Sequence, residues 1–160
     1  MLKICYLYPD LLRLHGNWGN MAAILKRCAW RQVEVDLVAV KQGEPVDFEK
    51  VDIVYLGTGT DHERDLVLAH LTPHKDNLQK AIERGLVVLA AGSGFHLLGM
   101  YRLTEEGTRI PNLALINFFT KTTSAYLVGD CVIGMHLAGN EVKVVGFENH
   151  REHTYMGAEL

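Results

Sequence analysis

Residues 86–99 read LVVLAAGSGFHLLG, and the interpretation of the chain starts from this stretch. Residues 86–91 are all apolar, which is typical of a strand buried on both faces of a sheet. The small residues Gly92, Ser93 and Gly94 then predict a tight turn that leads into a helix. This order is that of a nucleophile elbow, whose turn lifts one side chain over the sheet edge while backbone N–H groups hold an oxyanion. Glycine also serves plain turns and close packing, so the pattern alone leaves both interpretations open.

Upstream of this stretch, predicted strands alternate with predicted helices. Apolar runs predict strands over residues 3–8, 33–40 and 51–56, and helical spacing predicts helices over 17–31, 62–71 and 75–84. Asn17 and Asn20 are candidate N-caps of the first helix. Such alternation indicates βαβ units and a mainly parallel sheet.

Downstream of Gly99 the pattern becomes β-rich. Short β segments are predicted at residues 101–108, 114–120, 126–135 and 142–147, with turn signals at Glu106-Gly107 and Gly139-Asn140. The sequence therefore predicts an α/β protein with a mostly parallel sheet and a β-rich C-terminal part.

Composition narrows the class of protein. A chain of 160 residues with 48% apolar and 22% charged residues suits a single globular domain. A net charge of −3 gives no basic field for nucleic acid or an anionic membrane. No apolar run approaches the roughly 20 residues needed to cross a bilayer, and the N-terminus enters a strand directly. We therefore expect a cytoplasmic protein without nucleic-acid binding or membrane insertion.

Cysteine and histidine give no sign of a metal site. The three cysteines are far apart in sequence and form no C-x-x-C pair. Among the eight histidines, only His70 and His74 have an i, i+4 spacing, and Pro73 interrupts that helical face. We expect no metal and no other cofactor.

Two glycine-rich turns follow predicted strands and mark the expected ligand site. These are Gly57-Thr58-Gly59-Thr60-Asp61 and Gly92-Ser93-Gly94. Ligands of open α/β sheets bind at the carboxyl ends of strands, which is where both turns lie. Neither turn spells a P-loop or a dinucleotide fingerprint, so nucleotide binding has little support.

Six further segments extend over nearly the whole chain and carry a family resemblance. They are 6–12 (YLYPDLL), 16–20 (GNWGN), 26–31 (KRCAWR), 51–57 (VDIVYLG), 97–99 (LLG) and 146–150 (GFENH). With these segments the chain resembles the CobB/CobQ-type class I glutamine amidotransferases, and within them the GatD-type subunits of lipid II isoglutaminyl synthases. The resemblance implies a three-layer, flavodoxin-like fold. It also implies a glutaminase that passes ammonia to a Mur-ligase-like partner in cell-wall precursor amidation.

The departures from the family pattern fall at the expected site. The family's elbow reads Cys-Gly-Gly-Tyr-Gln, whereas here Gly92 stands at the nucleophile position and His96 replaces the glutamine. The family's loop reads Gly-Gly-Gly-Gln-Asp, and here Thr58 and Thr60 interrupt it. Tyr126 matches the position of a substrate-binding arginine.

The resemblance also bears on the extent of the domain. It places a catalytic histidine well beyond residue 150. We therefore expect one domain over residues 1–160 that lacks the family's C-terminal region and this histidine.

Ser93 and His150 each allow two interpretations. Ser93 would be a weak alternative nucleophile if a general base lay within hydrogen-bond reach, but a turn residue or helix cap is favoured. His150 belongs to the family segment, and a hydrogen bond that holds a loop is at least as plausible for it as a catalytic role.

Two functions remain in view for the whole chain. The first is a glutamine amidotransferase subunit that is catalytically impaired because of Gly92. The second is a non-catalytic binding or regulatory subunit, a pseudoenzyme that docks on a ligase partner.

Overall fold

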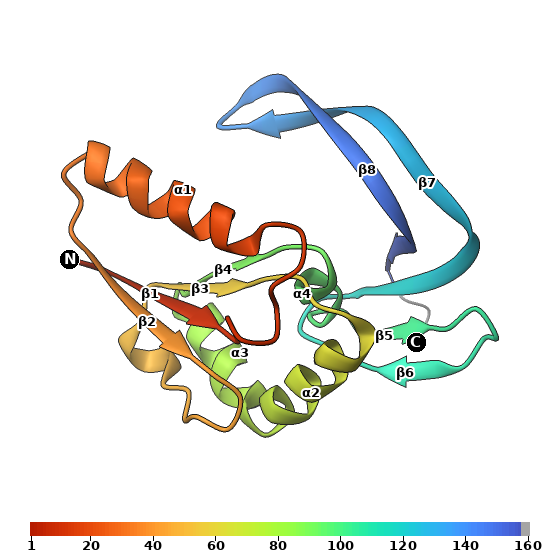
Figure 1. Ribbon diagram of the computed structural model, residues 1–160, viewed down its shortest axis with the longest axis horizontal. Helices are drawn as coiled ribbons and strands as arrows, with labels where there is room; N and C mark the ends of the chain where they lie inside the picture. Colours follow the sequence, from red (N-terminus) through yellow and green to blue (C-terminus); the bar gives the residue numbers. More distant parts are fainter. Residues whose placement is uncertain (158–160) are drawn as a thin grey trace.

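The structure is a computed structural model that describes residues 1–157. Its centre is a parallel sheet of four strands: β1 (Leu2–Leu7), β2 (Val35–Val40), β3 (Ile53–Leu56) and β4 (Val87–Ala90). The strand order is β2-β1-β3-β4 (Figure 1). The predicted strands are confirmed, with ends that shift by one or two residues.

Helices cover both faces of this sheet and make the three predicted layers. Helix α1 (Asn17–Trp30) lies on one face, while α2 (Asp61–Leu71) and α3 (Lys75–Glu83) lie on the other (Figure 1). Short 3₁₀ turns occur at η1 (Phe48–Lys50) and at η2 (Thr72–His74), which joins α2 to α3. None of the helices in the described chain is long and apolar enough to cross a membrane.

The sheet layers form because side chains of a strand alternate between its faces. Ile4 and Tyr6 of β1 pack with Met21 of α1, whereas Cys5 and Leu7 point to the other core. That second core is the larger, and it contains the buried residues of α2 and α3: Val67, Leu71, Leu78 and Ala81. The apolar stripes of the helices predicted from sequence therefore face the sheet from both sides.

Strand β4 corrects the prediction that residues 86–91 are buried on both faces. Val88 and Ala90 pack on the larger core, but Val87 and Leu89 are 55% and 44% exposed. The reason is position, since β4 pairs only with β3 and stands at the end of the described sheet. The all-apolar run at 86–91 therefore forms a strand with one buried face and one face that no described residue of the chain covers.

The C-terminal part corrects a second prediction, that of four short β segments. After the one-turn helix α4 (Ser93–His96) come two short strands, β5 (Tyr101–Leu103) and β6 (Arg109–Pro111). Two long strands follow, β7 (Phe118–Leu137) and β8 (Asn140–Met156), and the sheet order is β6-β5-β7-β8. The predicted segments 114–120 and 126–135 are joined because one register irregularity, between Thr122 and Leu127, bends the strand without ending it.

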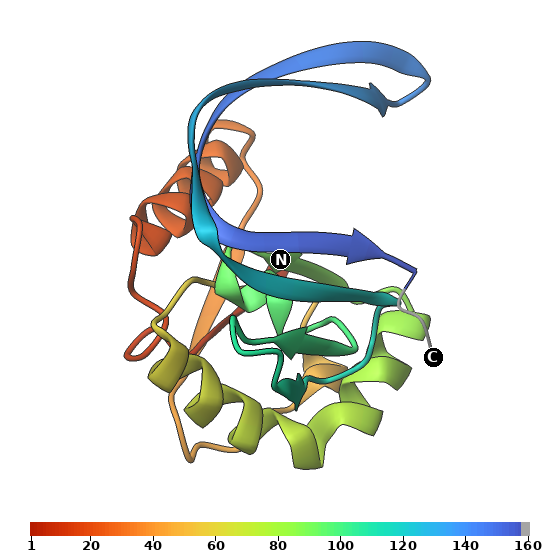
Figure 2. The same cartoon turned by 90° about the vertical axis from the view of Figure 1, so that its right-hand side faces the viewer.

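The β7–β8 hairpin curves away from the body of the molecule. Its base packs beside α4 and β5, and its far half arches over the α1 side of the sheet (Figures 1 and 2). Ala138 and Gly139 both have positive φ at the tip, as a type I′ hairpin turn requires. The turn predicted near Gly139 is therefore confirmed.

Candidate functional site

A pocket of about 390 Å³ lies at the carboxyl ends of β3 and β4. The start of α1, both glycine-rich loops, α2, α4 and β8 contribute to it. Its walls are His15, Asn17, Asn20, Thr58, Gly59, Asp61, Arg64, Ala91, Gly92, Ser93, His96, Asn149, His150 and Glu152. Sequence reasoning placed the ligand site at this edge of the sheet because two glycine-rich turns follow strands there.

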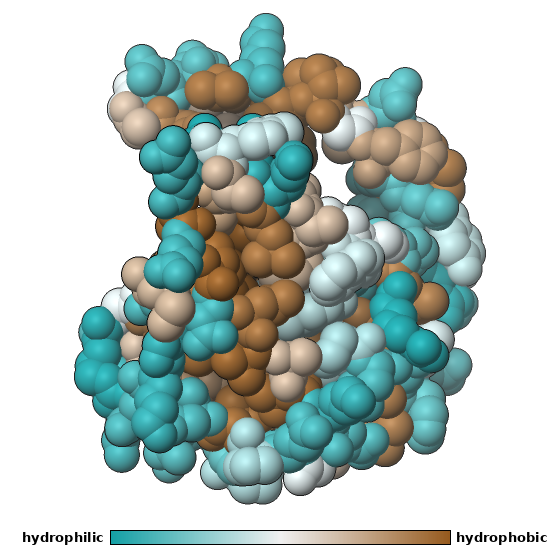
Figure 3. Space-filling view, turned by 60° about the vertical axis from the view of Figure 1, so that its left-hand side comes forward, coloured by the Kyte–Doolittle hydropathy of each residue, from teal (hydrophilic) through white to brown (hydrophobic). Residues whose placement is uncertain are grey.

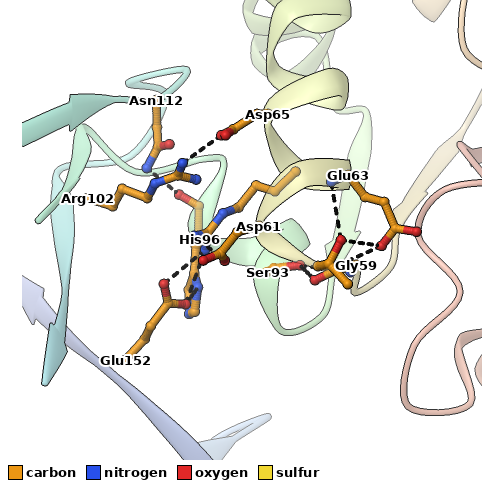
Figure 4. Close-up of polar contacts among 11 residues, drawn as sticks. Gly59, Asp61, Glu63, Asp65, Ser93, His96, Arg102, Asn112 and Glu152 are labelled. Carbon is orange, nitrogen blue, oxygen red and sulfur yellow. Dashed lines mark hydrogen bonds and ion pairs between the residues drawn. The ribbon is translucent and has the colours of Figure 1, made fainter. Parts of the chain in front are cut away.

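Most of the predicted site residues meet at this pocket. Thr58, Gly59, Gly92, Ser93 and His96 line it, and Figure 4 draws the contacts of Gly59, Ser93 and His96. Gly57 and Gly94 lie where the two loops touch, since a Cβ on Gly94 would clash with the carbonyl oxygen of Gly57. Tyr126 does not line the pocket, and its side chain is 64% exposed at the bend of β7.

Gly92 is the corner between β4 and α4. Its φ of 52° and ψ of −124° lie in a region that L-residues adopt only with strain. Ala91 N donates to Leu56 O at 2.9 Å, so the strand is held up to the residue before the corner. The backbone therefore has the sharp strand-to-helix turn of an elbow, but the corner residue carries no side chain.

Ser93 connects the two loops. Its side chain is buried, and its Oγ donates to Gly59 O at 3.0 Å and accepts from Gly59 N at 2.9 Å. Within residues 1–157, no histidine nitrogen is within hydrogen-bonding distance of this hydroxyl. Of the two structural roles expected for Ser93, a turn residue or a helix cap, the cap is not seen: Ser93 is the first residue of α4, and no side chain caps that helix.

Asn17 has a different role from the predicted helix cap. Gly16 is the N-cap of α1, with a left-handed φ of 74°, and no side chain caps the helix. The buried Asn17 amide donates to Leu12 O at 3.0 Å and to Thr58 O at 2.9 Å. Its Oδ1 accepts from the Tyr55 hydroxyl at 3.0 Å. Asn17 therefore fastens the first glycine-rich loop to the start of α1.

Thr60, at the end of the first glycine-rich loop, and Glu63 together cap the N-terminus of α2. Thr60 Oγ1 accepts from Glu63 N at 3.3 Å, and Glu63 Oε2 accepts from Thr60 N at 2.7 Å. This is a capping box, which satisfies two backbone N–H groups at once. Glu63 thus acts as a structural residue at the site's edge.

An ionic cluster joins α2, α4 and β8 beside the pocket (Figure 4). Arg64 of α2 is only 2% exposed, and its Nη1 donates to both carboxylate oxygens of Glu152 at 3.0 and 3.2 Å. Its Nη2 donates to Asp61 Oδ1 at 2.9 Å. His96 Nδ1 lies 2.6 Å from Glu152 Oε2, and the two form an ion pair when the imidazole is protonated.

The cluster controls the charge of Glu152. Burial by itself raises the pKa of this carboxyl, but the contacts with His96 and Arg64 outweigh it and lower the pKa to about 2. Glu152 is therefore ionised at neutral pH and compensates the buried Arg64 charge. Arg102 forms a parallel link, donating to Asp65 Oδ1 of α2 at 2.6 Å.

Sequence reasoning missed Arg64 and Glu152. They are 88 positions apart, and nothing in the spacing of either residue indicates the other. Their meeting depends on the register of the β7–β8 hairpin, which sets Glu152 opposite Thr122. The position of His96 was predicted, but its acidic partner was not.

His150 makes local contacts on β8. Its Nδ1 donates to Glu152 O at 2.8 Å, and its Nε2 lies 3.4 Å from Glu148 Oε2. The imidazole is half exposed and lines the pocket. This bond lies within strand β8, so His150 holds no loop in the structure, and the ring remains available to a ligand on its open side.

The sequence matches a known family over nearly its whole length. Residues 3–160 match the family model described as the CobB/CobQ-like glutamine amidotransferase domain. Two curated proteins are similar to the chain, each named lipid II isoglutaminyl synthase (glutamine-hydrolyzing) subunit GatD. The one from Staphylococcus aureus (strain N315) is 34% identical over 96% of this chain and 62% of its own length. The one from Streptococcus pneumoniae (strain ATCC BAA-255 / R6) is 32% identical over 97% of this chain and 59% of its own.

Solved structures share the fold. A Trypanosoma brucei CTPS glutaminase domain with bound acivicin superposes with a TM-score of 0.57 at 12% identity, over 95% of this chain and 67% of that one. A structure described as a glutamine amidotransferase gives a TM-score of 0.60 at 14% identity, over 97% of this chain and 75% of that one. The chain spans about 60% of the length of the curated relatives it matches.

Proposed function

This chain belongs to the CobB/CobQ-like glutamine amidotransferase family, and from that premise we propose that it is a GatD-like subunit that releases no ammonia from glutamine by itself. In this proposal it acts in the cytoplasm, docked on a Mur-ligase-like synthetase that amidates a lipid II type cell-wall precursor. The names of its relatives from Staphylococcus aureus and Streptococcus pneumoniae support the pathway.

The proposal that the chain does not hydrolyse glutamine rests on Gly92, which gives the corner between β4 and α4 no side chain. A class I glutaminase needs a nucleophile that attacks the side-chain amide of glutamine, with a base to take its proton. Here the corner residue has no side chain, and the neighbouring Ser93 hydroxyl already donates its only proton to Gly59 O. A hydroxyl without a base in contact is a weak nucleophile.

Exposed apolar strands support the docking part of the proposal. In the far half of the hairpin, Val132, Ile133, Val145 and Phe147 are each more than half exposed. Figure 3 shows apolar side chains gathered in a band on one face of the molecule, below the arching hairpin. Apolar patches of this kind typically mark interaction surfaces.

An amidation assay that compares two nitrogen sources tests the proposal. The chain and the Mur-ligase-like synthetase from the same organism are purified and combined, and complex formation is measured by light scattering. Amidation of a lipid II analogue is then followed with either ammonium or glutamine as the only nitrogen source. We expect a stable complex that uses ammonium and makes no product with glutamine.

Each other outcome changes the proposal in a defined way. Product formation with glutamine would contradict the non-hydrolytic part and require a nucleophile elsewhere in the complex. Failure of the two proteins to associate would contradict the docking part. The Staphylococcus aureus relative with its own synthetase serves as the control that the glutamine assay works.

A further inference from the structure

Thr58 fills the space beside Gly92 that any side chain at position 92 would need. A Cβ built on Gly92 lies well inside van der Waals contact with Thr58 Oγ1, and 3.1 and 3.2 Å from its Cγ2 and Cβ. Carbon atoms at optimal separation are about 3.5–4.0 Å apart. The corner therefore has room for the hydrogen of glycine and for nothing larger while Thr58 stays in place.

Hydrogen bonds hold Thr58 in its position. Its carbonyl oxygen accepts from Leu14 N and from Asn17 Nδ2, both at 2.9 Å, so its backbone is held from the side of α1. Its Oγ1 donates to Ala91 O at 3.0 Å. Threonine fills two of the three staggered positions about χ1, so a rotation moves only one branch away from Gly92 and leaves the Cβ contact unchanged.

Ser93 fastens the same two loops from the other direction. Thr58 of the first loop donates to Ala91, the residue before Gly92, and Ser93 of the second loop bonds Gly59, the residue after Thr58. Each loop thus gives one hydroxyl to the backbone of the other. These three hydrogen bonds fix the distance between the loops at the corner.

We propose that Thr58 is the residue that closes the elbow: it occupies the place of a nucleophile's side chain, and it is compatible only with glycine at position 92. That position 92 is the place of a nucleophile rests on the proposed function, whereas the steric exclusion of a side chain there rests on the geometry alone. It follows that a cysteine at position 92 restores no reactive thiol unless Thr58 is also removed.

A set of four proteins tests this coupling: the unchanged chain, Thr58→Gly, Gly92→Cys and the double variant Thr58→Gly/Gly92→Cys. We expect Gly92→Cys to lower the melting temperature by about 10 °C, and the added Thr58→Gly to recover at least half of that loss. We also expect iodoacetamide to modify residue 92 at least tenfold faster in the double variant, as measured by peptide mass spectrometry.

The chain contains its own references for the labelling. Cys28 is partly exposed and reports alkylation of an accessible thiol in every protein. Cys5 is buried, and burial raises its pKa to about 11, so it reports unfolding when it becomes labelled. Should Gly92→Cys not fold at all while the double variant does, the coupling is supported in its strongest form.

A matched glycine separates steric exclusion from backbone strain. Gly43 also has a positive φ, of 83°, but a Cβ there would meet no atom within 4 Å. We expect Gly43→Cys to lose the same stability whether or not Thr58 is replaced. An equal rescue of Gly43→Cys by Thr58→Gly, or equal labelling of residue 92 in both backgrounds, would overturn the proposal.

Acivicin, which is bound in the trypanosomal glutaminase domain, separates this inference from the proposed function. We expect the double variant to be modified by acivicin at residue 92 and to be protected by excess glutamine. Modification by iodoacetamide but not by acivicin would leave the steric role of Thr58 standing and contradict a glutamine pocket. A residue 92 that reacts with neither reagent would contradict the steric role.

Discussion

At the scale of single residues, the pocket combines an elbow backbone with side chains that hold loops together. The backbone at Gly92 turns sharply, with dihedral angles that would strain any residue with a side chain. Glycine adopts these angles readily because it has no Cβ. The hydroxyls of Thr58 and Ser93 donate hydrogen bonds to backbone carbonyls. Because these hydroxyls are already bonded to backbone carbonyls, they act as structural groups.

Ser93→Ala provides the prediction at this scale. The variant loses both contacts with Gly59 and leaves a buried N–H and carbonyl without that partner, so we expect a loss of about 2 kcal/mol in the free energy of unfolding. Chemical denaturation measures it. Ser124→Ala, at an exposed position of β7, is the control and should cost less than about 0.5 kcal/mol. A neutral Ser93→Ala would show that the Gly59 contacts contribute nothing to stability.

At the scale of elements, the Arg64–Glu152–His96 cluster fastens the β7–β8 hairpin to α2 and α4. The pKa of Glu152 is about 2 in the folded protein against an ordinary value of 4.5. Since the folded pKa is the lower one, this carboxylate contributes its full stability above about pH 4.5 and loses it as the pH falls toward 2.

Glu152→Gln therefore has a pH-dependent effect. We expect the variant to lose about 2 kcal/mol at pH 7, because the buried Arg64 loses a charged partner. Its stability should then depend less on pH than that of the unchanged chain between pH 4.5 and about 2. Denaturation curves at several pH values measure both effects. Glu148→Gln is the control, because the Glu148 carboxylate is partly exposed and its ion pair is with the half-exposed His150. Parallel pH curves for Glu152→Gln and the unchanged chain would contradict this account.

Local patterns predicted the N-terminal elements well and the hairpin poorly, for a physical reason. Alternating strands and helices follow from periodicities within ten or so residues, as in β1 and α1. The length of β7 depends instead on pairing with β8 across a bend at residues 122–127, which no local pattern specifies. The same dependence hid Glu152, whereas Gly92 and Ser93 were found because a turn after an apolar strand is a local signal.

At the scale of the whole molecule, one side of the sheet is less covered than the other. Leu89 of β4 is 44% exposed. Leu56 of the adjacent β3 points to the other face, where it is fully buried in the core between the sheet and helices α2 and α3. Helix α1 packs over β1, β2 and β3, and β4 extends beyond its contacts. The uncovered face and the curved hairpin lie on the same side of the molecule (Figure 1).

A comparison of two leucines tests how far this face is uncovered. We expect Leu56→Ala to cost about 3 kcal/mol, as a fully buried leucine does, and Leu89→Ala to cost less than about 1 kcal/mol. Thermal or chemical denaturation of both variants measures the difference. Similar losses at the two positions would mean that the β4 face is covered in solution, by another copy or by a further protein segment.

The far half of the hairpin gives a second prediction at this scale. Residues 127–150 form a two-stranded ribbon that pairs with no third strand in the described part of the chain, and isolated ribbons are marginally stable in water. We expect their amides to exchange with deuterium at least tenfold faster than those of residues 118–122 and 152–156, which pack on the body. Mass spectrometry of peptides measures the rates, and slow exchange at the hairpin tip would contradict an unpartnered ribbon.

The release of ammonia from glutamine by the purified chain tests the central claim most directly. The assay uses the chain at high concentration, with the Staphylococcus aureus relative as the positive control and Ser93→Ala as the control for a serine nucleophile. The account predicts a rate equal to that of the blank without protein. Turnover well above the blank that Ser93→Ala abolishes would contradict it, because the hydroxyl bonded to Gly59 would then be the nucleophile.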